Sequence, residues 1–191
     1  QGDEVTISGK HALTARFSEG ALMAKNLVLA IVMLLEAGFS AQDLESAVNL
    51  TDLYVPGRLE LVSESKPHVY VDYAHTPAGV ASAVAEIKQR YPKLTVILGA
   101  SGNRDQGKRT EMGIAGSNAD LLIITDQHPR DEDPAIIRHA LVTAAATKLE
   151  AGRILEIPDP AEAIQTAVAQ TDSDSAVLWC GPGHLTYREV R

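Results

Sequence analysis

From Leu59 onward, the chain alternates short apolar segments with longer segments whose apolar residues have helical spacing. The apolar segments have the length and β-branched content of strands, and they cover 59–62, 69–73, 94–98, 121–125, 154–157 and 176–179. Helices are predicted between them, over 77–91, 108–117, 134–149 and 160–169, and three of these begin with a proline that favours the first helical turn. This alternation predicts an α/β fold with a mainly parallel sheet and helices on both faces.

The first part of the chain has a different pattern. Two strands and two helices are predicted there, over 5–8, 12–17, 19–36 and 41–50. Asn26 lies inside the long helix, where a lone polar residue is usually solvent-facing or bonded locally. The Pro56-Gly57 pair punctuates the segment 53–58, which is the predicted linker. We therefore expect two domains, 1–54 and 55–191.

Composition excludes several classes of protein. The formal net charge of −8 over 191 residues argues against a non-specific nucleic-acid binder. Cys180 is the single cysteine, so neither an internal disulfide nor a cysteine-rich zinc site is expected, and a cytoplasmic location is favoured. No apolar run approaches the roughly 18 residues of a membrane span. The N-terminus lacks the features of a signal peptide and has the pattern of a strand without a preceding start, so a fragment of a longer protein is expected.

Polar, glycine and histidine residues gather directly after four of the predicted strands, at 72–77, 99–108, 126–130 and 181–184. The ends of parallel strands meet at one edge of a sheet, and ligands bind in the crevice beyond that edge. Loops are polar in most proteins, so charge alone does not identify a site. The concentration of charged, histidine and glycine residues in four such loops nevertheless favours a binding site.

The loop after the strand 94–98 contains a partial phosphate-binding motif. Gly102-x-x-x-x-Gly107-Lys108 matches the first seven places of a P-loop. The eighth place needs a Ser or Thr hydroxyl for magnesium, and Arg109 stands there. The loop is therefore interpreted as an anion site rather than a nucleotide-hydrolysing P-loop, and a solvated basic turn is an equally good interpretation of the spacing.

Five strings in this order resemble one family: VPGRLE (55–60), VDYAHTP (71–77), GNRDQGKR (102–109), HPRDEDP (128–134) and GPGH (181–184). They are similar to motifs of the Mur ligases of peptidoglycan synthesis, and within that family to the ligases that add the third amino acid. The resemblance implies a Rossmann-like amino-acid-binding domain over 55–191, preceded by the tail of a central ATPase domain over 1–54. It also implies that the UDP-sugar domain and the true P-loop lie outside this sequence.

The resemblance implies an ATP-dependent amide ligase that functions in cell wall biogenesis, and thereby in cell shape and cell division. ATP phosphorylates the D-glutamate side-chain carboxylate of UDP-N-acetylmuramoyl-L-alanyl-D-glutamate, and the amine of a diamino acid attacks the acyl phosphate. Mg²⁺ is implied, with ligands mostly outside this sequence, so no catalytic or metal-binding residue is expected within it. The expected partners are these substrates and the remaining domains of the same enzyme, without nucleic acid or membrane. The isolated chain is expected to be inactive.

The same resemblance implies two groups of binding residues. The group expected to face ATP consists of Asn26, Arg58, Asp72, Tyr73 and His75. Within it, Asp72 is expected to accept hydrogen bonds from the ribose hydroxyls, and Arg58 to meet the base or a phosphate. The group expected to face the incoming amino acid consists of Arg104, His128, Arg130, Gly181, His184 and Leu185, in which the two arginines grip carboxylates.

Two departures from the family pattern concern the amino acid that is added. The family's Asp-Asn-Pro-Arg string has Gln127 and His128 in its first two places in this chain, and the glutamate of Gly-x-Gly-His-Glu is replaced by Leu185. A leucine cannot accept a hydrogen bond from the distal ammonium of diaminopimelate, and burying that ammonium unpaired is expensive. Arg104 and Arg130 favour meso-diaminopimelate, whereas the departures favour lysine or ornithine, so the amino acid stays open.

Two alternative functions are retained. One is another ligase, either a different Mur-type enzyme or a folylpolyglutamate-type enzyme. The other is a non-catalytic Rossmann-like nucleotide-binding module, against which no Gly-x-Gly-x-x-Gly follows the first strand of the predicted sheet.

Overall fold

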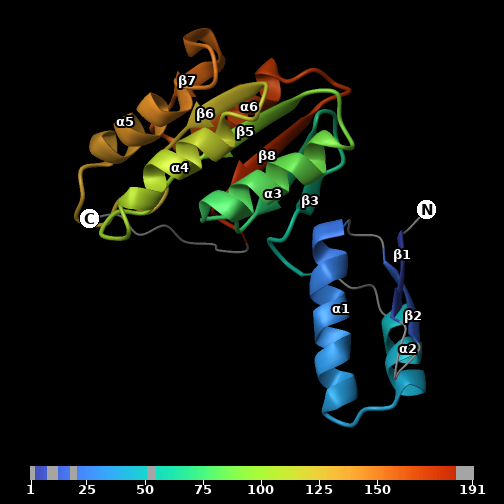
Figure 1. Cartoon of the computed structure of the whole chain (residues 1–191). Coiled ribbons are helices and arrows are strands. Elements are labelled where there is room, and N and C mark those ends of the chain that lie inside the picture. The colour runs from blue at the N-terminus through green and yellow to red at the C-terminus, as the bar shows by residue number, and fades with distance from the viewer. Residues whose placement is uncertain (1–2, 8–12, 18–20, 51–54, 184–191) are drawn as a thin grey trace. The chain divides into compact units, whose positions relative to one another are not determined.

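The computed structural model of the protein describes residues 3–7, 13–17, 21–50 and 55–183 (Figure 1). The chain forms two compact units, 1–55 and 56–191. Each unit has an apolar core of its own. Parts of the predicted elements lie outside the described residues, namely Ser8, Ala12, Glu19 with Gly20, and Leu53 with Tyr54 of the predicted linker.

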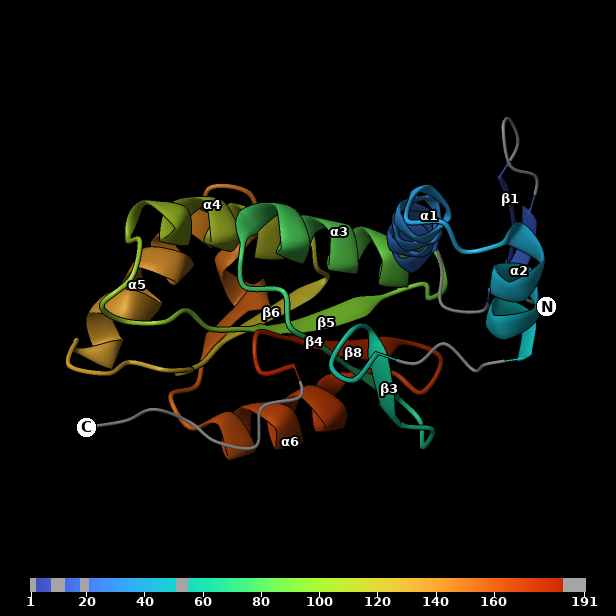
Figure 2. The same ribbon diagram turned by 90° about the horizontal axis from the view of Figure 1, so that it is seen from below.

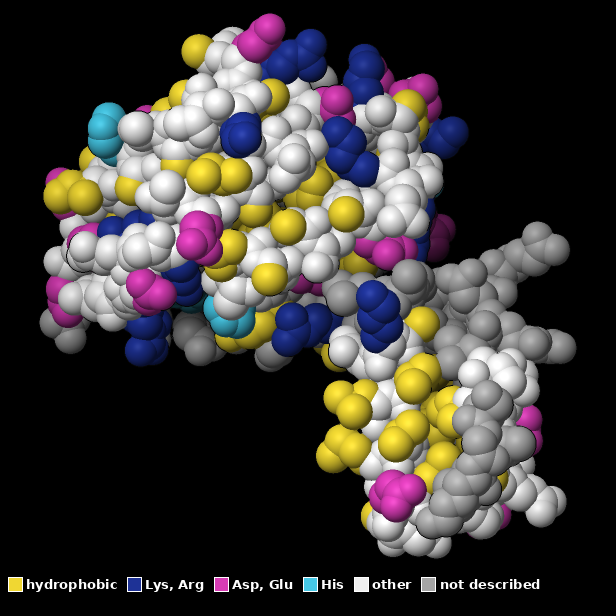
Figure 3. All heavy atoms as spheres, viewed as in Figure 1, with side chains coloured by type: hydrophobic (Ala, Val, Ile, Leu, Met, Phe, Trp, Pro, Cys, Tyr) yellow, Lys and Arg dark blue, Asp and Glu magenta, His cyan; other side chains and the backbone are white. Residues whose placement is uncertain are grey.

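The smaller unit consists of β1 (Asp3–Ile7), β2 (Leu13–Phe17), α1 (Ala21–Glu36) and α2 (Ala41–Leu50). The two strands pair antiparallel. Ile31 and Leu35 of α1 pack with Leu13 of β2 and Leu44 of α2, and all four side chains are buried. Other apolar side chains of α1 face outward, and Figure 3 shows them as a group of hydrophobic atoms on this helix.

The larger unit is built on a six-stranded sheet with the order β3-β4-β8-β5-β6-β7. The strands are β3 (Glu60–Ser63), β4 (His68–Asp72), β5 (Leu94–Leu98), β6 (Leu121–Ile124), β7 (Ile154–Glu156) and β8 (Ala176–Cys180). The edge strand β3 pairs antiparallel with β4, and all other neighbours pair parallel. β8 is inserted between β4 and β5, so the last strand of the sheet in chain order lies in its middle (Figure 1).

Helices cover both faces of this sheet (Figure 2). Helices α3 (Pro77–Lys88), α4 (Gly107–Gly116) and α5 (Pro134–Ala145) lie on one face, and α6 (Pro160–Gln170) lies on the other. Thr76, Asp133 and Asp159 cap α3, α5 and α6 by accepting backbone N–H groups, and a proline follows each cap. None of the described helices is long and apolar enough to cross a membrane.

The strands alternate their side chains between the two layers of helices. Leu94, Val96 and Leu98 of β5 belong to the core under α3, α4 and α5. Ile97 of the same strand belongs to the second core, with Ala163 and Ala167 of α6. Every residue of β5 is buried, as expected for a central strand covered on both faces. The predicted fold class, a mainly parallel α/β sheet with helices on both faces, is confirmed.

Candidate functional site at the carboxyl edge of the sheet

Four parallel strands end side by side at the edge where the sequence predicted a site. Asp72 and Cys180 are register partners across β4 and β8, and Leu98 pairs with Cys180 on one side and Ile124 on the other. The loops that follow these strands therefore begin at the same level. This register brings together the segments 72–77, 99–107, 125–133 and 181–183.

Asp72 is a buried carboxylate that organises the loop before β3. Its Oδ2 accepts a hydrogen bond from the backbone N–H of Leu59 at 2.8 Å, and its Oδ1 accepts one from Ala74 at 2.7 Å. Burial raises the pKa of Asp72 above its ordinary value, and the two N–H donors and the charge of Arg58 oppose that rise. Both oxygens thus face the protein's own backbone, and the ribose contact stays a prediction.

Arg58, Tyr73 and His75 form a cation–aromatic strip beside Asp72. The guanidinium carbon of Arg58 lies 5.1 Å from the centroid of the Tyr73 ring, within cation–π range. The rings of Tyr73 and His75 meet edge to face with centroids 4.9 Å apart, and Nδ1 of His75 lies 2.9 Å from the Tyr73 carbonyl oxygen. Lys108 donates to the His75 carbonyl oxygen at 3.2 Å, which adds a second cation. The family resemblance assigns no role to Lys108, although the partial P-loop match includes it.

The loops that contain Arg104 and Arg130 are bonded to each other. The Gly102 N–H donates to the His128 carbonyl oxygen at 2.8 Å, and Nη1 of Arg130 donates to the Gly102 carbonyl oxygen at 2.9 Å. A Cβ on Gly102 would lie 1.9 Å from the Pro129 carbonyl oxygen, so only glycine permits this approach. The structure therefore brings the segments of the two predicted arginines together.

The two arginines themselves differ in setting. Arg104 is exposed, with no hydrogen bond or ion pair to any residue that the structure describes. Arg130 is half-buried and has a backbone φ of +53°, in the left-handed region that disfavours non-glycine residues.

Arg109, in the eighth place of the P-loop-like string, is an internal structural residue. Its Nη1 and Nη2 donate to the two carboxylate oxygens of Glu132 at 2.6 and 2.7 Å, and its side chain is only 3% exposed. Hydrogen bonding to Arg109 lowers the pKa of Glu132 below its ordinary value of 4.5. Of the two arginines in this string, the exposed Arg104 is therefore the one whose guanidinium is open to a ligand.

Gln127 lies between the strand ends, although the sequence marks it only as a departure from the family pattern. A Cβ on Gly181, whose φ is +117°, would lie 2.3 Å from Nε2 of Gln127. A Cβ on Gly99 would lie 2.9 Å from the Gln127 Cβ. Gly181 also donates from its N–H to the Asp72 carbonyl oxygen at 2.8 Å, so this turn contacts both halves of the edge. No local sequence signal marks Gln127 as part of the site, because its neighbours come from other loops.

For the remaining predicted site residues, the described part of the structure shows no side-chain contact that indicates a ligand. His128 is buried, and its carbonyl oxygen belongs to the loop contact with Gly102. Asn26 is exposed on α1, in the smaller unit. His184 and Leu185 lie outside the described residues. Cys180 is fully buried, and burial raises the pKa of its thiol, so it is not a nucleophile at neutral pH.

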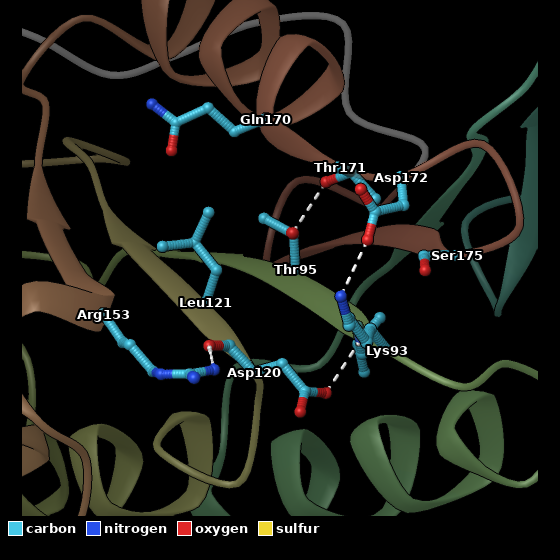
Figure 4. Close-up of a pocket in the computed structure, with 10 residues that line it drawn as sticks. Lys93, Thr95, Asp120, Leu121, Arg153, Gln170, Thr171, Asp172 and Ser175 are labelled. Carbon is cyan, nitrogen blue, oxygen red and sulfur yellow. Dashed lines mark hydrogen bonds and ion pairs between the residues drawn. The ribbon is translucent and has the colours of Figure 1, made fainter.

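A polar cavity of about 260 Å³ lies at the opposite, amino edge of the sheet (Figure 4). Its charged and hydroxyl groups are largely paired with one another. Lys93 bonds Asp172 at 2.8 Å, the hydroxyls of Thr95 and Thr171 are 2.7 Å apart, and Arg153 donates to the Asp120 carbonyl oxygen at 3.3 Å. Because these groups satisfy each other, the cavity offers few polar partners to a ligand.

Comparison with known proteins agrees with the motifs. Residues 57–183 match the family described as Mur ligase, glutamate ligase domain. The UDP-N-acetylmuramyl-tripeptide synthetase of Leifsonia xyli is 42% identical over 177 residues, which cover 90% of this chain and 34% of that protein. The UDP-N-acetylmuramoyl-L-alanyl-D-glutamate–2,6-diaminopimelate ligase of Rickettsia conorii is 37% identical over 176 residues, covering 90% and 35%.

A solved structure of a UDP-N-acetylmuramoyl-L-alanyl-D-glutamate–2,6-diaminopimelate ligase superimposes with a TM-score of 0.63 at 28% identity, covering 97% of this chain and 38% of that one. The chain thus spans about a third of the length of the relatives it matches. The family match includes the segments that form the carboxyl edge of the sheet, from Gly57 to Gly183. The chain belongs to the Mur ligase family, whose members are ligases of peptidoglycan synthesis.

Proposed function

We propose that this chain is the C-terminal portion of an ATP-dependent ligase that adds the third amino acid to UDP-N-acetylmuramoyl-L-alanyl-D-glutamate. Residues 55–191 are its amino-acid-binding domain, and residues 1–54 are the tail of its central ATPase domain. The observation that supports this most directly is the bonding of the Arg104 loop to the Arg130 loop at the carboxyl edge of the sheet. We propose a cytoplasmic location for this enzyme.

The amino-acid half of the site provides guanidinium groups for carboxylates. Arg104 is exposed, and Arg130 is anchored through one nitrogen to the Gly102 carbonyl oxygen. A guanidinium donates two parallel hydrogen bonds to a carboxylate, which fixes orientation as well as position. With the carboxylate end of the amino acid held in this way, its free amine is directed toward the acyl phosphate, and positioning of this kind accounts for much of the catalysis.

The ATP half of the site consists of Arg58, Tyr73, His75 and Lys108, with Asp72 beneath them. The stacked cation and ring of Arg58 and Tyr73 suit a base or a phosphate, and Lys108 adds a positive charge for developing phosphate charge. Asp72 fixes the backbone of this half through Leu59 and Ala74.

Mg²⁺ is implied by ATP-dependent chemistry, and in such sites it is held by one or two carboxylates together with the nucleotide phosphates. Among the described residues no group of three or more His, Cys, Asp or Glu side chains is placed to hold a metal ion. We propose that the protein ligands of this ion lie mostly in the preceding part of the enzyme. No side chain of this portion acts as a nucleophile, since the reaction joins an amine to an acyl phosphate.

The amino acid is one of lysine, ornithine or meso-diaminopimelate. The two arginines suit the two carboxylates of diaminopimelate. His128 and Leu185, which replace an amide and a carboxylate of the family pattern, favour lysine or ornithine, which lack the second carboxylate of diaminopimelate.

The test is turnover by the full-length enzyme that contains this chain. Phosphate release is followed with UDP-N-acetylmuramoyl-L-alanyl-D-glutamate and ATP, and the three amino acids are offered in turn. Activity with any of them supports the proposal and identifies the substrate. Absence of activity with all three, in an enzyme that binds ATP, would contradict the third-residue assignment. The chain alone is expected to give no turnover.

A further inference from the structure

We infer that Arg109 and Glu132 are positioning residues for the incoming amino acid, acting through the loops that contain Arg104 and Arg130. This inference rests on the proposed function, because it concerns the same amino-acid half of the site. We refer to the ion pair of Arg109 and Glu132 as the latch. Neither residue is expected to touch the substrate.

The Glu132 carboxylate of the latch binds several residues of the other loop. The carboxylate of Glu132 accepts hydrogen bonds from both terminal nitrogens of Arg109, and its Oε2 also accepts a hydrogen bond from the Asn103 N–H at 3.1 Å. Its Oε1 lies 3.5 Å from Nε2 of Gln106. Three residues of the Arg104 segment thus converge on a carboxylate that stands two places after Arg130.

The latch surrounds two residues in an unfavourable backbone conformation. Asn103 has a φ of +51° and Arg130 one of +53°, both in the left-handed region. Such conformations cost free energy and persist where the surroundings fix them. A further bond, from the Asp131 N–H to Oδ1 of Asn103 at 3.1 Å, lies between them. The latch is therefore one of the side-chain contacts that hold Asn103 and Arg130 in register, together with the Asn103–Asp131 and Arg130–Gly102 hydrogen bonds.

The latch uses the two terminal nitrogens of Arg109 and leaves its third nitrogen, Nε, without a partner among the described residues. This nitrogen is buried. A buried donor without an acceptor costs stability.

Apart from Lys108, which precedes Arg109 in the chain and donates to the His75 carbonyl oxygen, the ATP half is held independently of the latch. Its backbone bonds go to Asp72, and Arg58 stacks on Tyr73. Loosening the latch should therefore shift Arg130 and Arg104 without moving Arg58. The kinetic consequence is a higher KM for the amino acid with a nearly unchanged KM for ATP.

The test uses Glu132→Gln in the full-length enzyme, because the amide has the same shape and keeps one oxygen as an acceptor. We expect the KM for the amino acid to rise about tenfold, since small misplacements of binding groups are costly. The KM for ATP should stay within about twofold, and a fall in kcat should accompany the rise in the amino-acid KM, because both follow from the misplaced amine. Arg109→Lys keeps the charge but loses the fork and should give a smaller rise in the same direction.

The matched control is Glu86→Gln. Glu86 lies on α3, is also largely buried, and forms an ion pair with Arg90 that this substitution removes. Glu86→Gln should leave the KM for the amino acid, the KM for ATP and kcat unchanged. A second measurement, backbone hydrogen exchange on the same proteins, does not depend on turnover. Glu132→Gln should speed exchange in both 99–107 and 128–132, and Glu86→Gln in neither.

The outcomes separate the latch from the function it rests on. If the parent enzyme turns over none of the three amino acids, the proposed function fails. If the parent is active and Glu132→Gln leaves the amino-acid KM unchanged, or raises both KM values equally, the latch is refuted. A change confined to thermal stability would also refute it.

Discussion

The two halves of the carboxyl edge each contain a carboxylate withdrawn from solvent, Asp72 and Glu132, and the two differ in their partners. Asp72 accepts backbone N–H groups of Leu59 and Ala74. Glu132 accepts two parallel hydrogen bonds from the guanidinium group of Arg109. Accordingly, burial raises the pKa of Asp72, whereas hydrogen bonding to Arg109 lowers the pKa of Glu132.

The difference concerns how the two proposed binding regions of this sheet edge are fixed. Backbone bonds to Asp72 fix the ATP half, so its conformation depends on one side chain and the nearby main chain. The amino-acid half depends on close loop-to-loop approach and on an ion pair between side chains far apart in sequence. A substitution in one half should therefore leave the other nearly intact.

The largest expected effect is that of Gly102→Ala, which would break the amino-acid half alone. The new Cβ would lie 1.9 Å from the Pro129 carbonyl oxygen, so the two loops must separate. We expect the free energy of unfolding of the chain to fall by about 3 kcal/mol or more, measured by urea denaturation. The control is Gly152→Ala, whose Cβ meets nothing within 4 Å and should change stability by less than about 0.5 kcal/mol. Equal effects of the two variants would contradict the close approach.

Asp72→Ala breaks the ATP half instead. It leaves the N–H groups of Leu59 and Ala74 without their acceptor, so we expect a loss of about 2–3 kcal/mol of stability. In the full-length enzyme, the KM for ATP should rise while the KM for the amino acid stays near normal. Asp172→Ala, which removes an exposed ion pair with Lys93, is the stability control. An effect on the amino-acid KM alone would mean that the two halves are reversed.

Arg130→Ala tests the amino-acid half without removing the latch. Hydrogen bonds to charged groups contribute about 1.5–3 kcal/mol, so the KM for the amino acid should rise roughly 10- to 100-fold. The KM for ATP should remain near normal, because Arg58 and Tyr73 are untouched. Steady-state kinetics with saturating ATP measures the first effect and saturating amino acid the second. An unchanged amino-acid KM would remove Arg130 from the site.

The sequence predicts the sheet of this protein better than its site. The segment 94–98 is a strand with the predicted bounds because its unbroken apolar run matches burial on both faces. The helix predicted over 77–91 ends at Lys88. Tyr91 continues the apolar spacing of this helix but lies beyond its last residue, and its N–H donates to the Ile87 carbonyl oxygen. Local periodicity does not distinguish those two situations.

The site was predictable as a set of loops, but not as a set of contacts. The strand ends located the segments of Arg104, Arg130 and Gly181 correctly at one edge. The pairing of Arg109 with Glu132 and the approach of Gln127 to Gly181 join residues from different loops. Such contacts follow from the strand order, in which β6 lies beside β5 and β8 enters between β4 and β5, and no local pattern reveals that order.

The smallest expected effect concerns pH and compares the two carboxylates directly. The pKa of Glu132 in the folded state is below 4.5, so its contribution to stability is complete above pH 4.5 and is lost as pH falls through the folded value. The pKa of Asp72 is raised above 3.8, so its contribution is present below pH 3.8 and is lost as pH rises through the folded value. The two contributions therefore change with pH in opposite directions.

Urea denaturation of the chain between pH 3 and 6 separates these contributions when Glu132→Gln and Asp72→Asn are compared with the parent. The loss of stability caused by Glu132→Gln should grow as pH rises, because the parent gains its ion pair over that interval. The loss caused by Asp72→Asn should shrink as pH rises, because the parent then ionises a buried carboxyl that the amide does not have. Parallel slopes for the two variants would show that Asp72 and Glu132 are held by the same kind of interaction, and the division of the edge into two separately fixed halves would then have to be given up.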